Sequence, residues 1–144
     1  YDNFIADTGG SLIEVIDHTD PADPVVAALT ARTALLYIRG TEADAAELIR
    51  RFRQSPKPMY YQPPFLVRKW AEFKALNGVV RDEDVDPAAF GAWGFEALLT
   101  DRLPRYQGLA DRFGYTVDAR DLAKVGDSDD FIALMGEAIA NRMR

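Results

Sequence analysis

The sequence predicts an α/β protein in which helices flank a mostly parallel sheet. Three short runs, at positions 3–6, 33–38 and 115–117, are rich in the β-branched and aromatic residues of buried strands. Helical patterns lie between and after these runs. Because parallel strands need crossover connections that are usually helices, this alternation favours a parallel sheet.

Two helix starts are predicted from local sequence. Ser11 and Glu14 have the spacing of a capping box, in which the serine accepts from the backbone of Glu14 while the glutamate reaches back. This pair places a helix start directly after Gly9 and Gly10. A second helix is expected to begin at Thr41. Its inner face would be formed by Leu48, Ile49 and Phe52.

The C-terminal helix is predicted from apolar residues that recur at i, i+3, i+4, i+7 and i+8. Asp129 and Asp130 precede it and favour the positive end of its dipole. Further helical patterns cover 66–76 and 87–113, the second of which we expect to be interrupted or kinked at Pro104. The apolar residues of the C-terminal helix are Phe131, Leu134, Met135, Ala138 and Ile139.

Four prolines within residues 55–64 predict an extended surface loop, because proline fits neither a regular helix interior nor a central strand. The sequence has no internal repeat and no low-complexity segment. The simplest interpretation is therefore a single domain over residues 1–144.

Composition limits the classes of function. The 144 residues carry a formal net charge of −6, which argues against general affinity for nucleic acid. The absence of cysteine excludes disulfides and thiolate metal sites and fits a reducing compartment, so we expect a cytoplasmic protein. No apolar run has the length of a membrane span, so no membrane partner is expected. An apolar run begins at Phe4 without an initiator methionine, from which we expect an upstream segment.

The segment from Phe4 to Ser11 is the first candidate site. A predicted strand ends in Asp7 and is followed by Gly9, Gly10 and a helix start. A carboxylate at the end of a strand suits a Mg²⁺ site, and glycines let the backbone approach a ligand. The alternative is a simple turn in which Asp7 caps the following backbone.

Two basic segments are further candidates. Arg102 and Arg105 flank Pro104 and could direct a guanidinium towards an anion, although without further context solvation at the surface is the better explanation. The run 50–53 contains three arginines and leads to Lys57, so it either complements a helix dipole or forms part of a mobile loop over phosphates. The single histidine, His18, fits a solvated turn better than a metal site.

Taken in order, these motifs resemble shikimate kinase and its P-loop small-molecule kinase relatives. In that family a strand leads into a glycine triplet, then come a helix, a strand, a lid, an Arg-x-Pro-x-Tyr signature and a last strand with an aspartate. The lid here would be about 54–66, with an insertion at about 67–95. The corresponding residues are Ala6 to Ser11, Ala34 to Ile38, Lys57 to Met59, Arg102 to Tyr106, and Tyr115 to Asp118.

The resemblance implies a part in an ATP-dependent P-loop phosphotransferase or ATPase, with ATP and Mg²⁺ as cofactors and a small anionic acceptor. Asp7 would organise Mg²⁺, and Lys57 and Arg102 would act in catalysis. Thr8, Gly9, Gly10 and Arg105 would line the cofactor side.

The sequence also departs from the family. Ser11 breaks the glycine triplet, Lys57 replaces the lid arginine, and no GxxxxGK[ST] loop occurs, so the phosphate cradle and its strand are missing. We expect an N-terminal segment or a second chain to complete the sheet and the 144 residues alone to be inactive. The alternative is a non-catalytic binding or regulatory module that retains a degenerate fold.

Overall fold

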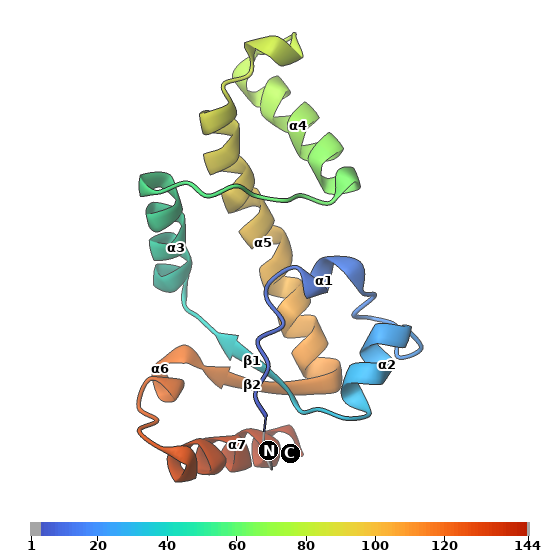
Figure 1. Ribbon diagram of the computed structural model, residues 1–144, viewed down its shortest axis with the longest axis vertical. Coiled ribbons are helices and arrows are strands. Elements are labelled where there is room, and N and C mark those ends of the chain that lie inside the picture. Colours follow the sequence, from blue (N-terminus) through green and yellow to red (C-terminus); the bar gives the residue numbers. More distant parts are fainter. Residues whose placement is uncertain (1–3, 144) are drawn as a thin grey trace. The chain divides into compact units, whose positions relative to one another are not determined.

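The computed structural model describes residues 4–143, which form two compact units (Figure 1). The first unit combines the segment up to Gly40 with the segment that begins at Arg102. The second unit comprises Thr41–Asp101. Helix α5 (Pro87–Phe113) contributes its first part to the second unit and its last part to the first.

The first unit is built on a parallel pair of strands, β1 (Leu35–Arg39) and β2 (Gly114–Asp118). Leu35 lies opposite Gly114, and Arg39 lies opposite Asp118. The end of α5 and α1 lie on one side of this pair, and α7 packs on β2 from the other side (Figure 1). The α/β class is therefore confirmed, with a sheet of two strands in the part of the chain that the structure describes.

Four further helices complete the first unit. A core of Ile13, Ile16 and Val26 joins the first two of them to the end of α5, where Tyr106 and Phe113 pack on it. Asp23 caps the second helix by accepting from two backbone amides, and Pro24 follows at a position where the missing N–H costs nothing. The four helices are α1 (Leu12–Val15), α2 (Pro24–Thr30), α6 (Ala119–Leu122) and α7 (Ser128–Arg142).

The first predicted strand is not formed. Residues 4–6 belong to no helix or strand, and position 3 of that run lies outside the described residues. The side chains of Phe4 and Ile5 are 86% and 79% exposed. A strand needs a neighbour for its backbone hydrogen bonds, and β1 pairs with β2 instead of with this segment. Apolar composition alone was therefore insufficient to form a strand at residues 4–6.

The predicted capping box at Ser11 is also wrong. A helix does begin after Ser11, but Ser11 makes no side-chain cap and has helical dihedrals, φ −79° and ψ −17°, where an N-cap is normally extended. Glu14 forms an ion pair with Arg102 instead of reaching back. A long-range charged partner has replaced the local one.

The second unit is helical. Helix α3 starts after a complete capping box between Thr41 and Asp44, so the predicted start is confirmed. On its predicted inner face Phe52 is buried and stacks on Phe95 with ring centroids 4.2 Å apart, whereas Leu48 is exposed. The elements are α3 (Glu42–Gln54), α4 (Pro63–Asn77), the 3₁₀ helix η1 (Asp82–Asp84) and the first part of α5.

Aromatic rings form the core of the second unit. Phe90 makes edge-on contacts with Trp70 and Phe73, at centroid distances of 4.7 and 5.5 Å. Asp82 accepts hydrogen bonds from the indole of Trp70 and from Lys74, which hold its pKa below the usual range and tie η1 to α4. These contacts hold α4 and the first part of α5 together, so the predicted insertion at about 67–95 is a packed pair of helices.

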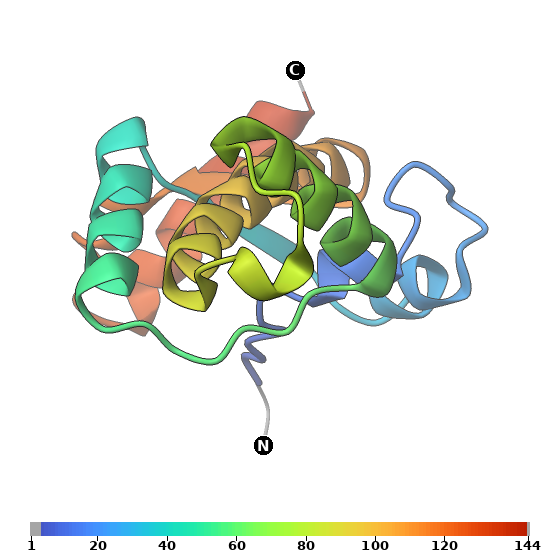
Figure 2. The ribbon, with the colours of Figure 1, turned by 90° about the horizontal axis from the view of Figure 1, so that it is seen from above.

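The predicted proline-rich loop is shorter than expected. The chain is irregular from Ser55 to Gln62, and helix α4 then begins at Pro63 (Figure 2). Proline suits the first turn of a helix because its N–H would have no partner there. Pro104, by contrast, lies inside α5, and the helix continues through it without a break.

We predict that Gly114→Ala will destabilise the sheet. A Cβ at position 114 would lie 2.6 Å from the carbonyl oxygen of Leu35, so the two paired strands would have to separate. The free energy of unfolding, measured by urea denaturation with circular dichroism, should fall by about 1–3 kcal/mol.

Gly136→Ala is the matched control. A Cβ at this position in α7 meets nothing within 4 Å, so the variant should gain roughly 0.5–1 kcal/mol from reduced backbone freedom in the unfolded chain. Equal stability of Gly114→Ala and the wild type would contradict the close approach of β1 and β2.

Candidate functional site

The glycine motif and the arginine motif meet in the first unit. The hydroxyl of Tyr106 donates to the carbonyl oxygen of Gly10 at 2.7 Å. A Cβ on Gly10 would lie 2.8 Å from both Nη1 of Arg102 and the hydroxyl of Tyr106. Arg102 and Tyr106 are one helical turn apart on α5 and so share a face. Both side chains therefore approach the backbone of Gly10, and a larger residue there would require their ends to shift.

Arg102 is held by Glu14 of α1. Its Nε donates to Oε1 of Glu14 at 2.5 Å, and Nη2 contacts the same oxygen. The two side chains are only 17% and 5% exposed. An ion pair shielded from water in this way must stay paired, since either charge alone would be costly to bury. The guanidinium is thus fixed beside Gly10.

A small cavity lies beside Tyr106 and Gly9. Its volume is about 100 Å³, which is room for roughly three water molecules at ~30 Å³ each. Pockets for drug-sized ligands are usually several times larger, about 300–1,000 Å³. The lining comes from the glycine loop, α1, β1 and α5: Thr8, Gly9, Leu12, Ile13, Leu35, Leu36, Tyr37, Tyr106, Leu109 and Ala110.

Two tyrosines give the cavity its polar character. The rings of Tyr37 and Tyr106 lie with centroids 5.9 Å apart. Burial raises the pKa of both hydroxyl groups, and the positive charge of Arg102 opposes this only partly at Tyr106. Both groups therefore stay protonated at neutral pH, and the hydroxyl of Tyr106 donates to Gly10.

Asp7 has a local structural role. Its Oδ1 accepts from the backbone N–H of Gly9 at 2.8 Å, and Gly9 has a positive φ of 65°, which favours glycine. This turn is the capping arrangement that we considered as the alternative to a metal site. Within residues 4–143, no group of three or more Asp, Glu or His side chains is placed to hold a metal ion.

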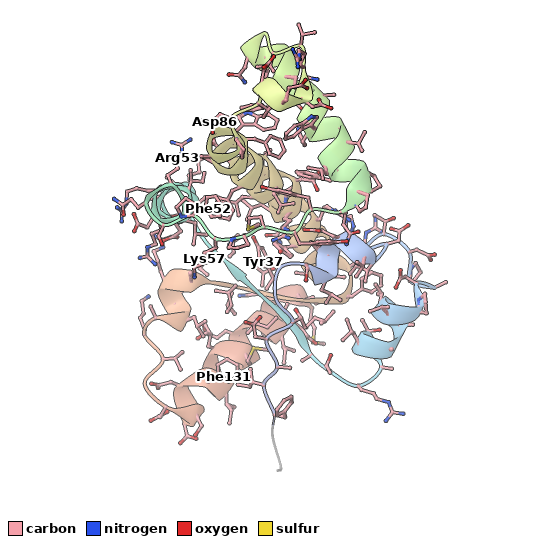
Figure 3. The ribbon with its side chains drawn as sticks, turned by 45° about the horizontal axis from the view of Figure 1, so that its top comes forward. Tyr37, Phe52, Arg53, Lys57, Asp86 and Phe131 are labelled. Atoms are coloured by element: carbon pink, nitrogen blue, oxygen red, sulfur yellow. The ribbon has the colours of Figure 1, made fainter. Side chains whose placement is uncertain are left out.

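The other predicted site residues are Thr8 and Arg105 of the first unit and Lys57 of the second. Thr8 is exposed and lines the cavity, and Arg105 is half-buried on α5. Lys57 is exposed in the loop that follows α3 and belongs to the second unit (Figure 3). Their predicted roles towards a ligand stay predictions.

The basic run of α3 is engaged in ion pairs. Arg50 and Arg51 both contact Glu47, and their hydrogen bonds lower the pKa of that carboxyl to about 2. Arg53 pairs with Glu96 at 2.8 Å. These contacts favour the structural interpretation of the run, as i, i+3 and i, i+4 pairs on a solvated helix face.

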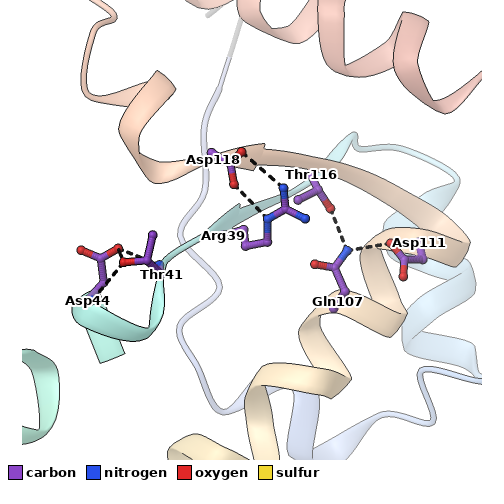
Figure 4. A network of polar contacts seen from close by, with 7 residues as sticks. All are labelled: Arg39, Thr41, Asp44, Gln107, Asp111, Thr116 and Asp118. Atoms are coloured by element: carbon purple, nitrogen blue, oxygen red, sulfur yellow. Dashed lines mark hydrogen bonds and ion pairs between the residues drawn. The ribbon is translucent and has the colours of Figure 1, made fainter. Parts of the chain in front are cut away.

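Three residues at the first unit's site were missed in the sequence. The sequence pattern predicts a helix cap for Glu14 and only a strand position for Tyr37. The third, Arg39, forms a two-oxygen ion pair with Asp118 at the ends of β1 and β2, with distances of 2.9 and 3.3 Å (Figure 4). A charged residue at the end of each of two strands was the available signal, since parallel strands end at the same edge.

His18 is also placed by the first unit. It is half-buried, and a Cβ on Gly108 of α5 would lie 3.1 Å from its Cδ2. The ring therefore packs on the helix backbone.

Gln107 donates to Asp111 and Thr116, which links α5 to β2 (Figure 4).

Comparison with family models, with curated proteins and with solved structures found no match for this chain. None of the helices in the described residues is long and apolar enough to cross a membrane. The candidate site therefore has to be interpreted from its own geometry.

We predict that Tyr106→Phe will lower the free energy of unfolding by about 1 kcal/mol, because the carbonyl of Gly10 loses its hydrogen bond. Urea denaturation measures the loss. Tyr60→Phe, at an exposed position, is the control and should leave stability unchanged within about 0.5 kcal/mol.

The same variant tests the raised pKa of Tyr106. Because the folded state keeps this proton to higher pH than the unfolded chain, the associated stability is complete below pH 10 and lost as pH rises through the folded-state pKa. Tyr106→Phe should remove one late step from the absorbance titration at 295 nm. Loss of a step at the ordinary tyrosine pKa, instead of a late one, would contradict the burial of this hydroxyl.

Proposed function

We propose that the chain is part of an ATP-dependent phosphotransferase or ATPase and that Arg102 binds an anionic group beside Gly10. The observation that carries the proposal is the meeting of the two motifs, 96 residues apart, through the Tyr106–Gly10 hydrogen bond. Both motifs stand in the order that the resemblance to P-loop small-molecule kinases implies. A guanidinium next to a glycine backbone suits recognition of an oxyanion.

The described residues fit such a role only in part. Asp7 offers an exposed carboxylate on the glycine loop, and Arg102 offers a fixed cation. The sequence holds no loop that could cradle the β and γ phosphates of a nucleotide. Under this proposal that loop belongs to another segment or chain, and no chemical step is assigned to these 144 residues alone.

Each residue would contribute to positioning and charge neutralisation, which are the main demands of phosphoryl transfer. Asp7 would face Mg²⁺, and Arg102 would orient the acceptor anion. Thr8, Gly9, Gly10 and Arg105 would face the nucleotide. Lys57, in the proline-rich loop, would approach the transferred phosphoryl group.

The second candidate function is a non-catalytic binding or regulatory module. It is favoured over turnover by a specific observation, because the cavity beside Tyr106 is only about 100 Å³, whereas ligand pockets usually measure about 300–1,000 Å³. A module of this kind would bind an anion without turning over ATP.

We predict that Asp7→Asn lowers Mg²⁺-dependent ATP turnover at least roughly 100-fold, because the charge that would hold the metal is lost. The assay uses the polypeptide with any segment encoded in frame upstream of Tyr1. Asp20→Asn is the matched control, because Asp20 makes the same turn contact, to the amide of Ala22 at 2.8 Å, outside the motif.

Unchanged turnover in Asp7→Asn would overturn the metal role of that carboxylate. A wild-type protein that binds phosphate or nucleotide without turnover would instead favour the binding module. Equal losses in Asp7→Asn and Asp20→Asn would trace the effect to the turns and not to a metal.

A further inference from the structure

Glu14 stands where an anionic ligand of Arg102 would stand. Its carboxylate contacts Nε and Nη2 of Arg102, while Nη1 faces the backbone of Gly10. With side chains 17% and 5% exposed, neither charge is well solvated. Arg102 therefore needs an anion at this position at all times, because a buried guanidinium without a partner is strongly unfavourable.

The contact with Glu14 engages one carboxylate oxygen. Both Nε and Nη2 of Arg102 meet Oε1. Elsewhere in the chain, Arg39 meets both oxygens of Asp118, and Arg50 meets both oxygens of Glu47. The two-oxygen arrangement matches the planar fork of arginine better, and a phosphate or carboxylate group of a ligand can provide it.

The backbone around Glu14 is held by the core, although Glu14 lies on a short helix. Ile13 and Ile16, which flank it, are 1% and 5% exposed and hold α1 on the core. Helix α1 has only four residues, and Val15 on its outer side is exposed. An exchange of anions at Arg102 would require the Glu14 side chain to rotate away from the guanidinium to a position where water reaches its carboxylate.

The absence of a side chain on Gly10 lets Arg102 and Tyr106 reach its backbone. Any side chain at position 10 would collide with Nη1 of Arg102 and with the hydroxyl of Tyr106. Tyr106 stays protonated because burial raises its pKa, so its hydroxyl adds no competing negative charge. Among residues 4–143, the anion that a ligand of Arg102 must displace is the carboxylate of Glu14.

We propose that Glu14 is an internal competitor for the anion site of Arg102, so that a ligand carrying a phosphate or carboxylate group binds by displacing it. This inference rests on the proposed role of Arg102 in the preceding section. Glu14 would thereby regulate the affinity of Arg102 for the ligand, because only the molecules in which Glu14 does not occupy the site can bind it.

The test is a titration with inorganic phosphate at constant ionic strength, followed by the amide resonances of Gly9 and Gly10. Glu14→Gln keeps the shape of the side chain and removes its charge. It should tighten phosphate binding at least about tenfold, the factor expected if Glu14 occupies the site nine-tenths of the time. Adding Arg102→Met to Glu14→Gln should abolish the gain.

Glu47→Gln is the matched control. It makes the same charge change at a carboxylate that also pairs with arginine, but on α3 in the second unit. It should leave the shifts of Gly9 and Gly10 as in the wild type. A gain in Glu47→Gln equal to that in Glu14→Gln would reduce the effect to net charge and overturn the proposal, as would no gain in Glu14→Gln.

Glu14→Asp covers the case in which Glu14→Gln does not fold. It keeps the charge but shortens the reach by one methylene, so phosphate affinity should rise by a smaller factor of about two to five, again through partial release of the site. An unchanged affinity in a folded Glu14→Asp protein overturns the proposal.

The result is separable from the proposed catalytic function. An Arg102-dependent gain in Glu14→Gln without any ATP turnover would support the competitor and reject the phosphotransferase. Turnover that depends on Asp7, together with a Glu14→Gln protein of unchanged phosphate affinity, would support the phosphotransferase and reject the competitor.

Discussion

The ion pair between Arg102 and Glu14 organises the candidate site of the first unit. It joins α1 to α5 across 88 residues of sequence and brings the arginine motif to the glycine loop. The Tyr106–Gly10 hydrogen bond lies one turn further along α5 and fixes the same loop. A Cβ at position 10 would lie 2.8 Å from Nη1 of Arg102 and from the hydroxyl of Tyr106, so a larger residue would require these side-chain ends to shift.

The sheet sets the other constraint on this unit. β1 and β2 pair directly, with Gly114 against the backbone of Leu35 and with Arg39 bonded to Asp118 at the opposite end. The resemblance to P-loop kinases placed a missing strand between residues 4–6 and β1. Because residues 4–6 form no strand, the described residues contain no pair of strands with such a gap between them. Phe4 and Ile5, from the predicted first strand, are exposed and have no partner strand in this sheet.

Elements with strong local signals could be predicted from the sequence. The two formed strands, the helix after Thr41, the helix over 87–113 and the C-terminal helix all appear where the patterns placed them. The errors occurred where a local preference competed with a distant partner. Glu14 left the capping box for Arg102, and the apolar run at 4–6 had no neighbour to complete its hydrogen bonds. Pro63 was assigned to the loop although proline is favoured at a helix start.

By itself, the sequence determined the α/β class, most helix positions and the residue types of the candidate site, because periodicity, capping and glycine content are local properties of the chain. Only the tertiary structure decided which of those residues meet. It placed Arg102 and Tyr106 on Gly10, selected Glu14 as the partner of the arginine and left Asp7 bonded to the turn of Gly9. The physical reason is that the energy of a charged or polar group depends on what surrounds it after folding, and residues 88 to 96 positions apart in the sequence supply those surroundings.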